Sequence, residues 1–184
     1  MLSNFTTEID YKAQQMSLVR DVEDATTPLD PGITVIPFRT TQNGLISVET
    51  QIDDSRFVNA ILDTGASSTV MSLASVKRLE MNGSIIKGQT VQVVGAAGVT
   101  DNVELLFLRT CKIANLAQSN LRALILDFAA INETSGFEQS AILGGDFLRN
   151  LKMTIDFNHA RLMLEPQTPA VTRCQPDQKV ASRN

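Results

Sequence analysis

The chain has 184 residues, of which 43% are hydrophobic and 20% charged, and its formal net charge is −4. This length fits one domain with tails rather than two full domains. The acidic balance and the scattered Lys and Arg residues argue against a nucleic-acid partner, and no apolar run approaches the ~20 residues that a membrane span needs.

Cysteine and histidine are scarce. Cys111 and Cys174 are too few for a disulfide framework and lack the spacing of metal ligands. His159 is the only histidine, so a zinc site with two histidines cannot form within one chain. A nucleophile paired with histidine would also depend on His159, which follows Asn158 in an expected turn. We therefore expect no metal or other cofactor, and carboxylates must carry any hydrolytic chemistry.

The chain begins with a polar stretch, residues 1–31, which we expect to be a flexible N-terminal extension. The turn-rich segment TTPLDPG at residues 26–32 marks its end. The compartment is not determined by the sequence, but the absence of a basic-then-apolar signal and the unpaired cysteines favour the cytoplasm.

From residue 32 onward the pattern predicts a mostly β domain that ends at residue 166, followed by a tail at 167–184. Residues 45–52 alternate, with Ile46, Val48, Thr50 and Ile52 on one face. Further strands are expected at residues 57–62, 90–94, 103–113, 121–126, 141–143, 153–157 and 161–164. Residues 72–81 are expected to form a short helix capped by Ser72, and 146–151 a helical turn. Residues 129–139 are expected to form a polar loop.

The segment at residues 60–72 reads AILDTGASSTVMS. An apolar strand leads directly into Asp63, and the turn that follows can present backbone N–H groups to its carboxylate. Thr64 can hold this turn through its hydroxyl, and Gly65 permits a close backbone approach. A plain β-turn is the alternative interpretation, because Asp, Thr and Gly are common in turns.

A second, similar unit follows at residues 141–148, which read AILGGDFL. The tripeptide Ala-Ile-Leu recurs, again before a glycine-containing turn, which indicates a degenerate internal repeat with an approximate twofold relation. Chance reuse of an apolar tripeptide is the alternative. Gly144 stands where the first unit has Asp63, so one half of the expected symmetric site lacks a carboxylate.

The remaining acidic residues have structural interpretations. We expect Asp146 to begin a helix or turn and Asp156 to be structural, while Asp53 and Asp54 form a hairpin turn. His159 is expected to be an exposed turn residue.

The two glycine-turn motifs resemble the active-site loop and the hydrophobic-hydrophobic-Gly element of the retropepsins, the retroviral-type, single-domain aspartic proteases. Residues 153–157 and 162–164 resemble the closing hairpin of the family's bacterial and retroelement-like members. The resemblance covers about residues 33–164 in the family's order. It implies a small, closed, barrel-like β domain with one or two short helices.

The resemblance also implies a homodimer in which two copies of Asp63 activate a water that attacks a polypeptide. Within the active-site loop, Thr64, Gly65 and Ala66 would shape the turn. A flap formed by Gly95, Ala96, Ala97 and Gly98 would cover the substrate, and Ile142, Leu143 and Gly144 would support the loop. A catalytically silent module of the same fold, used for dimerisation or peptide binding, is the alternative.

Overall fold

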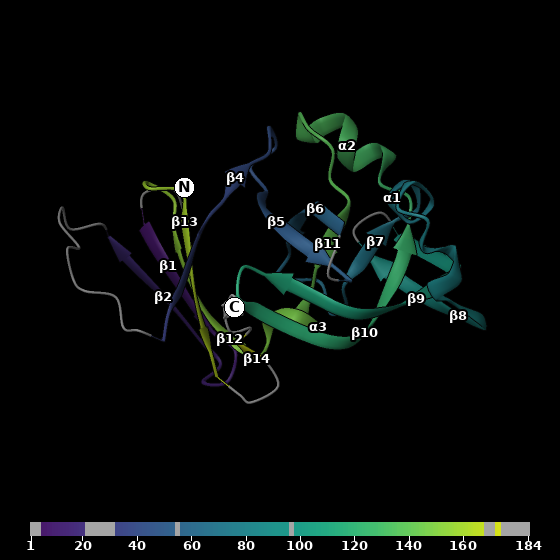
Figure 1. Cartoon of the computed structure of the whole chain (residues 1–184). Helices are drawn as coiled ribbons and strands as arrows, with labels where there is room; N and C mark the ends of the chain where they lie inside the picture. Colours follow the sequence, from purple (N-terminus) through teal and green to yellow (C-terminus); the bar gives the residue numbers. More distant parts are fainter. Residues whose placement is uncertain (1–4, 21–31, 54–55, 96–97, 168–171, 174–184) are drawn as a thin grey trace, which may run out of the picture.

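A computed structural model describes residues 5–20, 32–53, 56–95, 98–167 and 172–173. Its strands form two sheets that lie next to each other (Figure 1), and short helices surround the larger one. The expectation of a mostly β fold is confirmed.

The smaller sheet has five antiparallel strands. Their order is β2 (Gln15–Arg20), β1 (Phe5–Asp10), β12 (Leu151–Asp156), β13 (Arg161–Pro166) and β3 (Thr34–Pro37). Strands β12 and β13 are the predicted closing hairpin, which is therefore confirmed.

The larger sheet has nine strands and carries the motifs found in the sequence. Its order is β14 (Thr172–Arg173), β10 (Leu116–Leu126), β7 (Val70–Ser72), β11 (Ala141–Leu143), β6 (Arg56–Leu62), β5 (Ile46–Ile52), β9 (Gly98–Ile113) and β8 (Ile85–Gly95), with β4 (Arg39–Thr40) beside β5. Strand β9 also pairs with β10. The closed barrel and the homodimer stay predictions.

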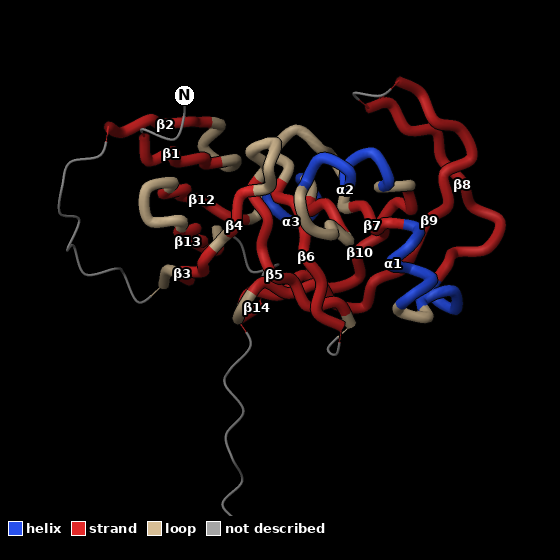
Figure 2. Tube along the Cα trace, turned by 90° about the horizontal axis from the view of Figure 1, so that it is seen from above, coloured by secondary structure: helices blue, strands red, loops and turns tan. Residues whose placement is uncertain are grey.

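Figure 2 shows the β8–β9 hairpin reaching away from the body, at the end opposite the five-stranded sheet. The hairpin is the region in which the sequence places the flap. Gly95 and Gly98 close it as a register pair, whereas Ala96 and Ala97 lie outside the described residues.

In the described part of the chain, four short helical segments join the strands: α1 (Leu73–Arg78), η2 (Met81–Ser84), α2 (Ala129–Ser135) and α3 (Gly145–Leu148). The predicted cap of the first is confirmed, since the Ser72 hydroxyl accepts a hydrogen bond from the Ser75 N–H at 3.0 Å. Helix α3 is the expected helical turn after residue 145. Within the described ranges, no helix has the length and apolar character required to span a bilayer.

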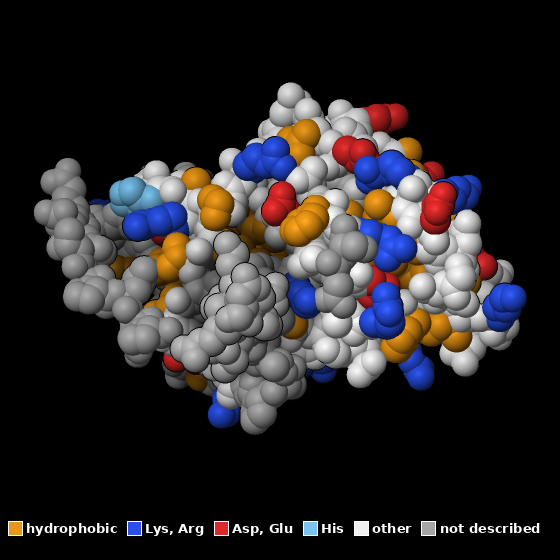
Figure 3. Space-filling view, viewed as in Figure 1, with side chains coloured by type: hydrophobic (Ala, Val, Ile, Leu, Met, Phe, Trp, Pro, Cys, Tyr) orange, Lys and Arg blue, Asp and Glu red, His pale blue; other side chains and the backbone are white. Residues whose placement is uncertain are grey.

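One hydrophobic core joins both sheets. The predicted inward face of β5 is confirmed, because Val48, Thr50 and Ile52 are buried; on the opposite face Glu49 is exposed, but Ser47 is buried. The same core contains Met153 and Leu162 of the smaller sheet. The outer surface seen in Figure 3 mixes Lys and Arg with Asp and Glu over most of the larger sheet.

Residues 5–20 belong to the segment that was expected to be a flexible N-terminal extension, and they contain regular structure instead. These residues form the β1–β2 hairpin, and β1 pairs with β12 from Thr6↔Asp156 to Asp10↔Lys152. The two strands have no apolar alternation that would predict them, because Thr7 is the only buried side chain in either of them. Backbone pairing with an available strand, rather than apolar alternation, places the hairpin.

Two other segments expected to be irregular contain regular structure. Residues 129–135 form α2, which ends at Gly136 with a φ of +79°, and the Asn132 side chain bonds the backbone of Gln139 at 2.7 and 3.2 Å. Polar contacts hold this helix, so it has no apolar periodicity to reveal it. In the tail, residues 172–173 pair with β10 as β14.

Candidate active site

Asp63 stands at the end of β6, where the buried part of the strand gives way to a turn. Val58, Ala60 and Ile61 are buried and fix the strand in the core. The Asp63 N–H donates to the Leu143 carbonyl at 3.1 Å, which extends the pairing of β6 with β11 by one residue. The side chain is partly exposed, so the carboxylate is held by the core yet remains accessible.

The turn wraps around the carboxylate. Asp63 Oδ1 accepts hydrogen bonds from the N–H of Gly65 at 2.9 Å and of Ala66 at 3.3 Å. A Cβ added to Gly65 would lie 3.3 Å from Oδ1, so glycine permits this close approach. Oδ2 accepts no hydrogen bond from the described part of the chain. One carboxylate oxygen is thus used to orient the group and the other is available for chemistry.

The two copies of Ala-Ile-Leu are direct neighbours in the sheet. Strands β6 and β11 run parallel in the register Ala60↔Ala141, Ile61↔Ile142 and Leu62↔Leu143. Strand β11 is inserted between β6 and β7, which follow each other in sequence. Asp63 and Gly144 follow the two tripeptides directly. Because the tripeptides are paired in register, the turns that begin at these two residues are adjacent.

Gly144 lies against the loop that follows Asp63. A Cβ at this position would be 2.5 Å from the carbonyl oxygen of Ser68 and 2.8 Å from its nitrogen. Any side chain here would displace the Ser68 backbone. The second turn therefore has no room for a side chain at this position, and of the two matching positions only Asp63 carries a carboxylate.

Helix α3 ties the second turn to the first. The Gly145 N–H donates to the Ala66 carbonyl at 2.8 Å, and the Asp146 N–H donates to the Ser67 carbonyl at 3.1 Å. The Asp146 carboxylate accepts the Thr69 N–H at 2.9 Å and the Thr69 hydroxyl at 2.7 Å. Asp146 therefore has the structural role expected of it, at the start of a helix.

Asp156 and Asp53, the other acidic residues discussed in the sequence analysis, also form hydrogen bonds with groups of the same chain. Asp156 bonds the Arg161 guanidinium at 2.7 Å and the ring and N–H of His159, whose side chain is 65% exposed. Burial opposes the charge on Asp156, but the bonds from Arg161 and His159 outweigh it and lower its pKa. Asp53 accepts the N–H groups of Arg109 and Thr110 at 2.8 and 3.1 Å. Asp54 lies outside the described residues.

The predicted site residues fall into two groups in space. Asp63 to Ala66 and Leu143 to Gly144 are brought together by the hydrogen bonds above. Gly95 and Gly98 belong to the projecting hairpin, beside the exposed and mutually paired Val94 and Val99. Across the described ranges, no cluster of three or more His, Cys, Asp or Glu side chains could hold a metal ion.

Tyr11 is a residue of the N-terminal hairpin that sequence reasoning did not single out. It lies between β1 and β2 and packs against the hydrophobic core. Burial, together with the charge of Asp63, raises the pKa of its phenol.

The inserted β11 strand and the oriented carboxylate at the end of β6 define an aspartic-protease type of domain. A family model described as aspartyl protease matches residues 48–147, which is more than half of the chain. The chain therefore belongs to the aspartyl protease family, and the resemblance to retropepsins is confirmed.

Among solved structures, a retropepsin-like aspartic protease from Rickettsia conorii is similar, with 16% identity and a TM-score of 0.53. The match covers 73% of this chain and 92% of that one. EIAV protease in complex with an inhibitor has 24% identity and a TM-score of 0.35, covering 57% and 86%. An aspartic proteinase from Irpex lacteus has 14% identity and a TM-score of 0.49, covering 90% and 58%. At sequence identities this low, structural similarity is evidence about the fold and not about the activity. A comparison with curated proteins gave no match.

Proposed function

We propose that this protein is an aspartic endopeptidase in which two copies of Asp63, one from each protomer of a homodimer, share one catalytic site. The observation that carries the proposal is the pair of adjacent turns, of which one has an oriented, accessible carboxylate and the other has Gly144. One chain thus supplies half of a carboxylate pair. A twofold dimer, the commonest oligomer, supplies the other half.

The proposed chemistry needs both carboxylates in different protonation states. Two carboxyl groups about 3 Å apart cannot both ionise, so they share a proton. The ionised Asp63 takes a proton from water as the water oxygen attacks the peptide carbonyl carbon. The protonated Asp63 of the other copy gives its proton to the carbonyl oxygen. A proton then passes to the peptide nitrogen, the C–N bond breaks, and an acid and an amine leave.

Other residues have supporting roles in this proposal. Thr64 is exposed at the tip of the loop, where its hydroxyl can bond the loop of the second copy. Ile142, Leu143 and Gly144 support the loop through the bonds and the close packing described above. The β8–β9 hairpin, closed by Gly95 and Gly98, covers a polypeptide substrate as a flap. Residues 32–166 are the proposed catalytic domain, to which the β1–β2 hairpin adds two strands.

The first experiment compares the wild type with Asp63→Asn, which keeps the shape of the side chain and removes its charge. Both are incubated with an unstructured protein substrate from about pH 4 to 7, and both are examined by sedimentation. Cleavage by the wild type alone, with both proteins dimeric, supports the proposal. If both dimerise and neither cleaves, the silent dimerisation or peptide-binding module is the better interpretation.

A mixing experiment then tests whether the two carboxylates belong to different chains. Wild type is diluted with Asp63→Asn at constant total protein, under conditions where protomers exchange. If only dimers with two Asp63 residues are active, an equal mixture retains about a quarter of the activity, because random pairing makes a quarter of the dimers wild type. Retention of about half, in proportion to the wild type present, would show that each chain acts alone.

A further inference from the structure

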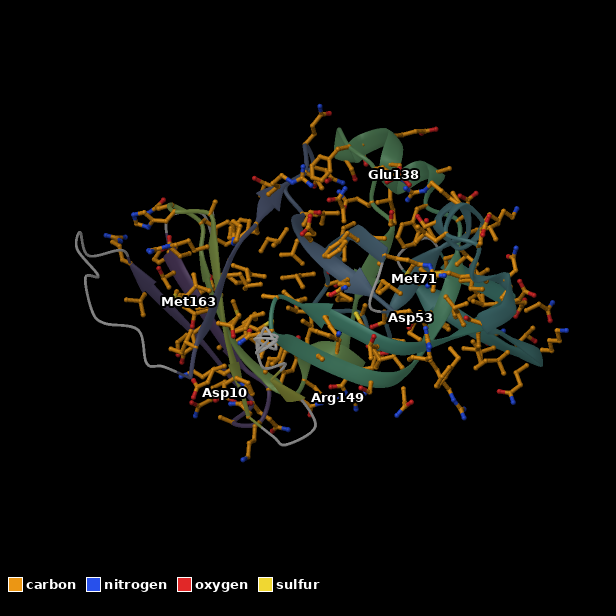
Figure 4. The ribbon with its side chains drawn as sticks, viewed as in Figure 1. Asp10, Asp53, Met71, Glu138, Arg149 and Met163 are labelled. Atoms are coloured by element: carbon orange, nitrogen blue, oxygen red, sulfur yellow. The ribbon has the colours of Figure 1, made fainter. Side chains whose placement is uncertain are left out.

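Strand β2 is the outermost strand of the five-stranded sheet, which Figure 4 shows at the left of the molecule with Asp10 of β1 and Met163 of β13 labelled. In the described part of the chain, its outer edge pairs with no other strand. Exposed edge strands are usually protected by charges, proline or a short length, because their free N–H and C=O groups pair readily with another strand. The opposite edge has such protection, since β3 has four residues and ends in Pro37. Strand β2 reads QMSLVR, with no proline and one charge, Arg20, at its end, so this edge is open to a further strand.

Two apolar rows on the inner face of this sheet continue onto β2. Residues directly opposite each other in antiparallel strands share a face of the sheet, so the register puts Leu18 and Met16 on the face that packs on the core. From β13 to β2, the rows are Leu162–Ile155–Thr7–Leu18 and Leu164–Met153–Ile9–Met16. The members in β13 and β12 are buried, whereas Leu18 is 48% and Met16 57% exposed. The apolar face therefore extends beyond the part of the chain that covers it.

The sequence of β2 is suited to pairing with its own copy. When two identical strands pair antiparallel about a twofold axis normal to the sheet, residues on the inner face stay on the inner face. With the axis at Ser17, Met16 lies opposite the partner's Leu18, and Leu18 lies opposite the partner's Met16. These are two apolar cross-strand pairs, which stabilise a sheet. Arg20 lies at the end of the strand, away from the axis, so no like charges oppose each other.

The open edge also lies on a side of the molecule that can complete the proposed site. In Figure 2, β2 and the β8–β9 hairpin both reach the upper edge of the view, from opposite ends of the molecule. A stable interface covers about 800 Å² of each partner, which is more than one strand of six residues supplies. The exposed Thr64 of the Asp63 loop and the exposed Val94 and Val99 of the hairpin can supply the remainder.

We propose that β2 pairs with β2 of a second copy of this chain, so that the two five-stranded sheets join into one continuous sheet across the dimer axis. The pairing covers Met16 and Leu18 and satisfies the free backbone groups of the edge. It also completes the catalytic site, which lacks a carboxylate until the second copy brings its own Asp63. The inference rests on the proposed homodimeric function and names the surface that forms the dimer.

Charge variants test the pairing. One variant carries Met16→Glu and Leu18→Glu, and the other carries Met16→Lys and Leu18→Lys, both at exposed positions. Each variant alone sets like charges opposite each other, so we expect its dimer Kd, measured by sedimentation, to rise about a hundredfold. An equal mixture of the two brings opposite charges together, and its Kd should return to within about tenfold of the wild-type value. Val35→Glu, at an exposed apolar position of β3 on the opposite edge, is the matched control and should dimerise as the wild type does.

Cleavage should follow dimerisation. At a concentration at which the wild type is dimeric, each charge variant alone should lose cleavage and the mixture should recover it. The inference is overturned if the charge variants dimerise as the wild type does, if they do not associate when mixed, or if the wild type is monomeric throughout. Unchanged dimerisation with a raised KM would show that β2 receives the substrate instead, and a lowered unfolding midpoint alone would show that the chain's own residues cover it. If the wild type is dimeric but cleaves nothing, the peptidase function fails, while sedimentation still decides whether β2 forms the interface.

Discussion

Substitution of Gly144 by alanine isolates the packing between the two adjacent turns. Gly144 has a φ of −101° and a ψ of −168°, extended values that any residue adopts, so alanine brings no backbone strain of its own. The only penalty comes from the added Cβ, which would lie 2.5 Å from the Ser68 oxygen and 2.6 Å from its carbonyl carbon. Both neighbours are backbone atoms, so no side chain can rotate to make room.

The expected magnitude follows from the cost of overpacking. Extra methyl groups in packed sites cost about 1–3 kcal/mol, and we expect the upper end because the backbone itself must move. For a chain of this length, about 1 kcal/mol lowers the unfolding midpoint by roughly 2–4 °C. Gly144→Ala should therefore unfold roughly 6–12 °C below the wild type. Proteolytic activity should also fall, and by more than the loss of folded protein explains, because Ser68 belongs to the loop that begins at Asp63.

The matched control is Gly83→Ala, since a Cβ at Gly83 meets nothing within 4 Å. The three proteins are unfolded thermally and in urea at one protein concentration, because dimerisation would make stability depend on concentration. Gly83→Ala should match or slightly exceed the wild type in stability. If Gly144→Ala is as stable as Gly83→Ala, the close contact with Ser68 does not exist as described and the reasoning fails.

Three further predictions concern the dimer, the pH dependence of stability and a buried thiol. Thr64→Val, which removes an exposed hydroxyl at the loop tip, should weaken dimerisation by about 1–3 kcal/mol, because two symmetric hydrogen bonds are lost. Thr64→Ser keeps the hydroxyl and should dimerise as the wild type does. Sedimentation measures the affinity of both variants, and equal affinities would show that Thr64 is not part of the interface. Asp156 has a lowered pKa in the folded protein, so its contribution is present above the unfolded pKa of about 4 and is lost as pH falls through the folded value. Asp156→Asn should therefore lower the free energy of unfolding by about 1–3 kcal/mol at neutral pH, and urea titrations should show the difference shrinking in acid; a constant difference would contradict this. Burial raises the pKa of the Cys111 thiol, so a thiol reagent should reach Cys111 only on unfolding, and rapid labelling of Cys111 in the native protein, located by peptide mapping, would contradict its burial.

Several elements were predictable from the sequence because their cause is local. The β5 strand follows from alternation, and helix α1 follows from the cap at Ser72 and the apolar spacing after it. Strands β6 and β11 follow from two short apolar runs that each end in a glycine-containing turn.

The elements that were missed depend on partners distant in sequence. Strand β1 exists beside β12, about 145 residues later in the chain. Helix α2 is held by polar contacts, among them those of Asn132 with Gln139, and its surface is mostly exposed. Neither element has the apolar period from which secondary structure is inferred, because neither buries a continuous apolar face.

The sequence by itself determined that carboxylates must carry any hydrolytic chemistry, that Asp63 ends an apolar strand in a glycine turn, and that a second such unit lacks the carboxylate. These conclusions depend on residue type and spacing alone. Only the tertiary structure decided that the two Ala-Ile-Leu strands are in-register neighbours and that Gly144 is pressed against Ser68. Those facts arise from backbone pairing and close packing between distant segments, which leave no periodic trace in the chain.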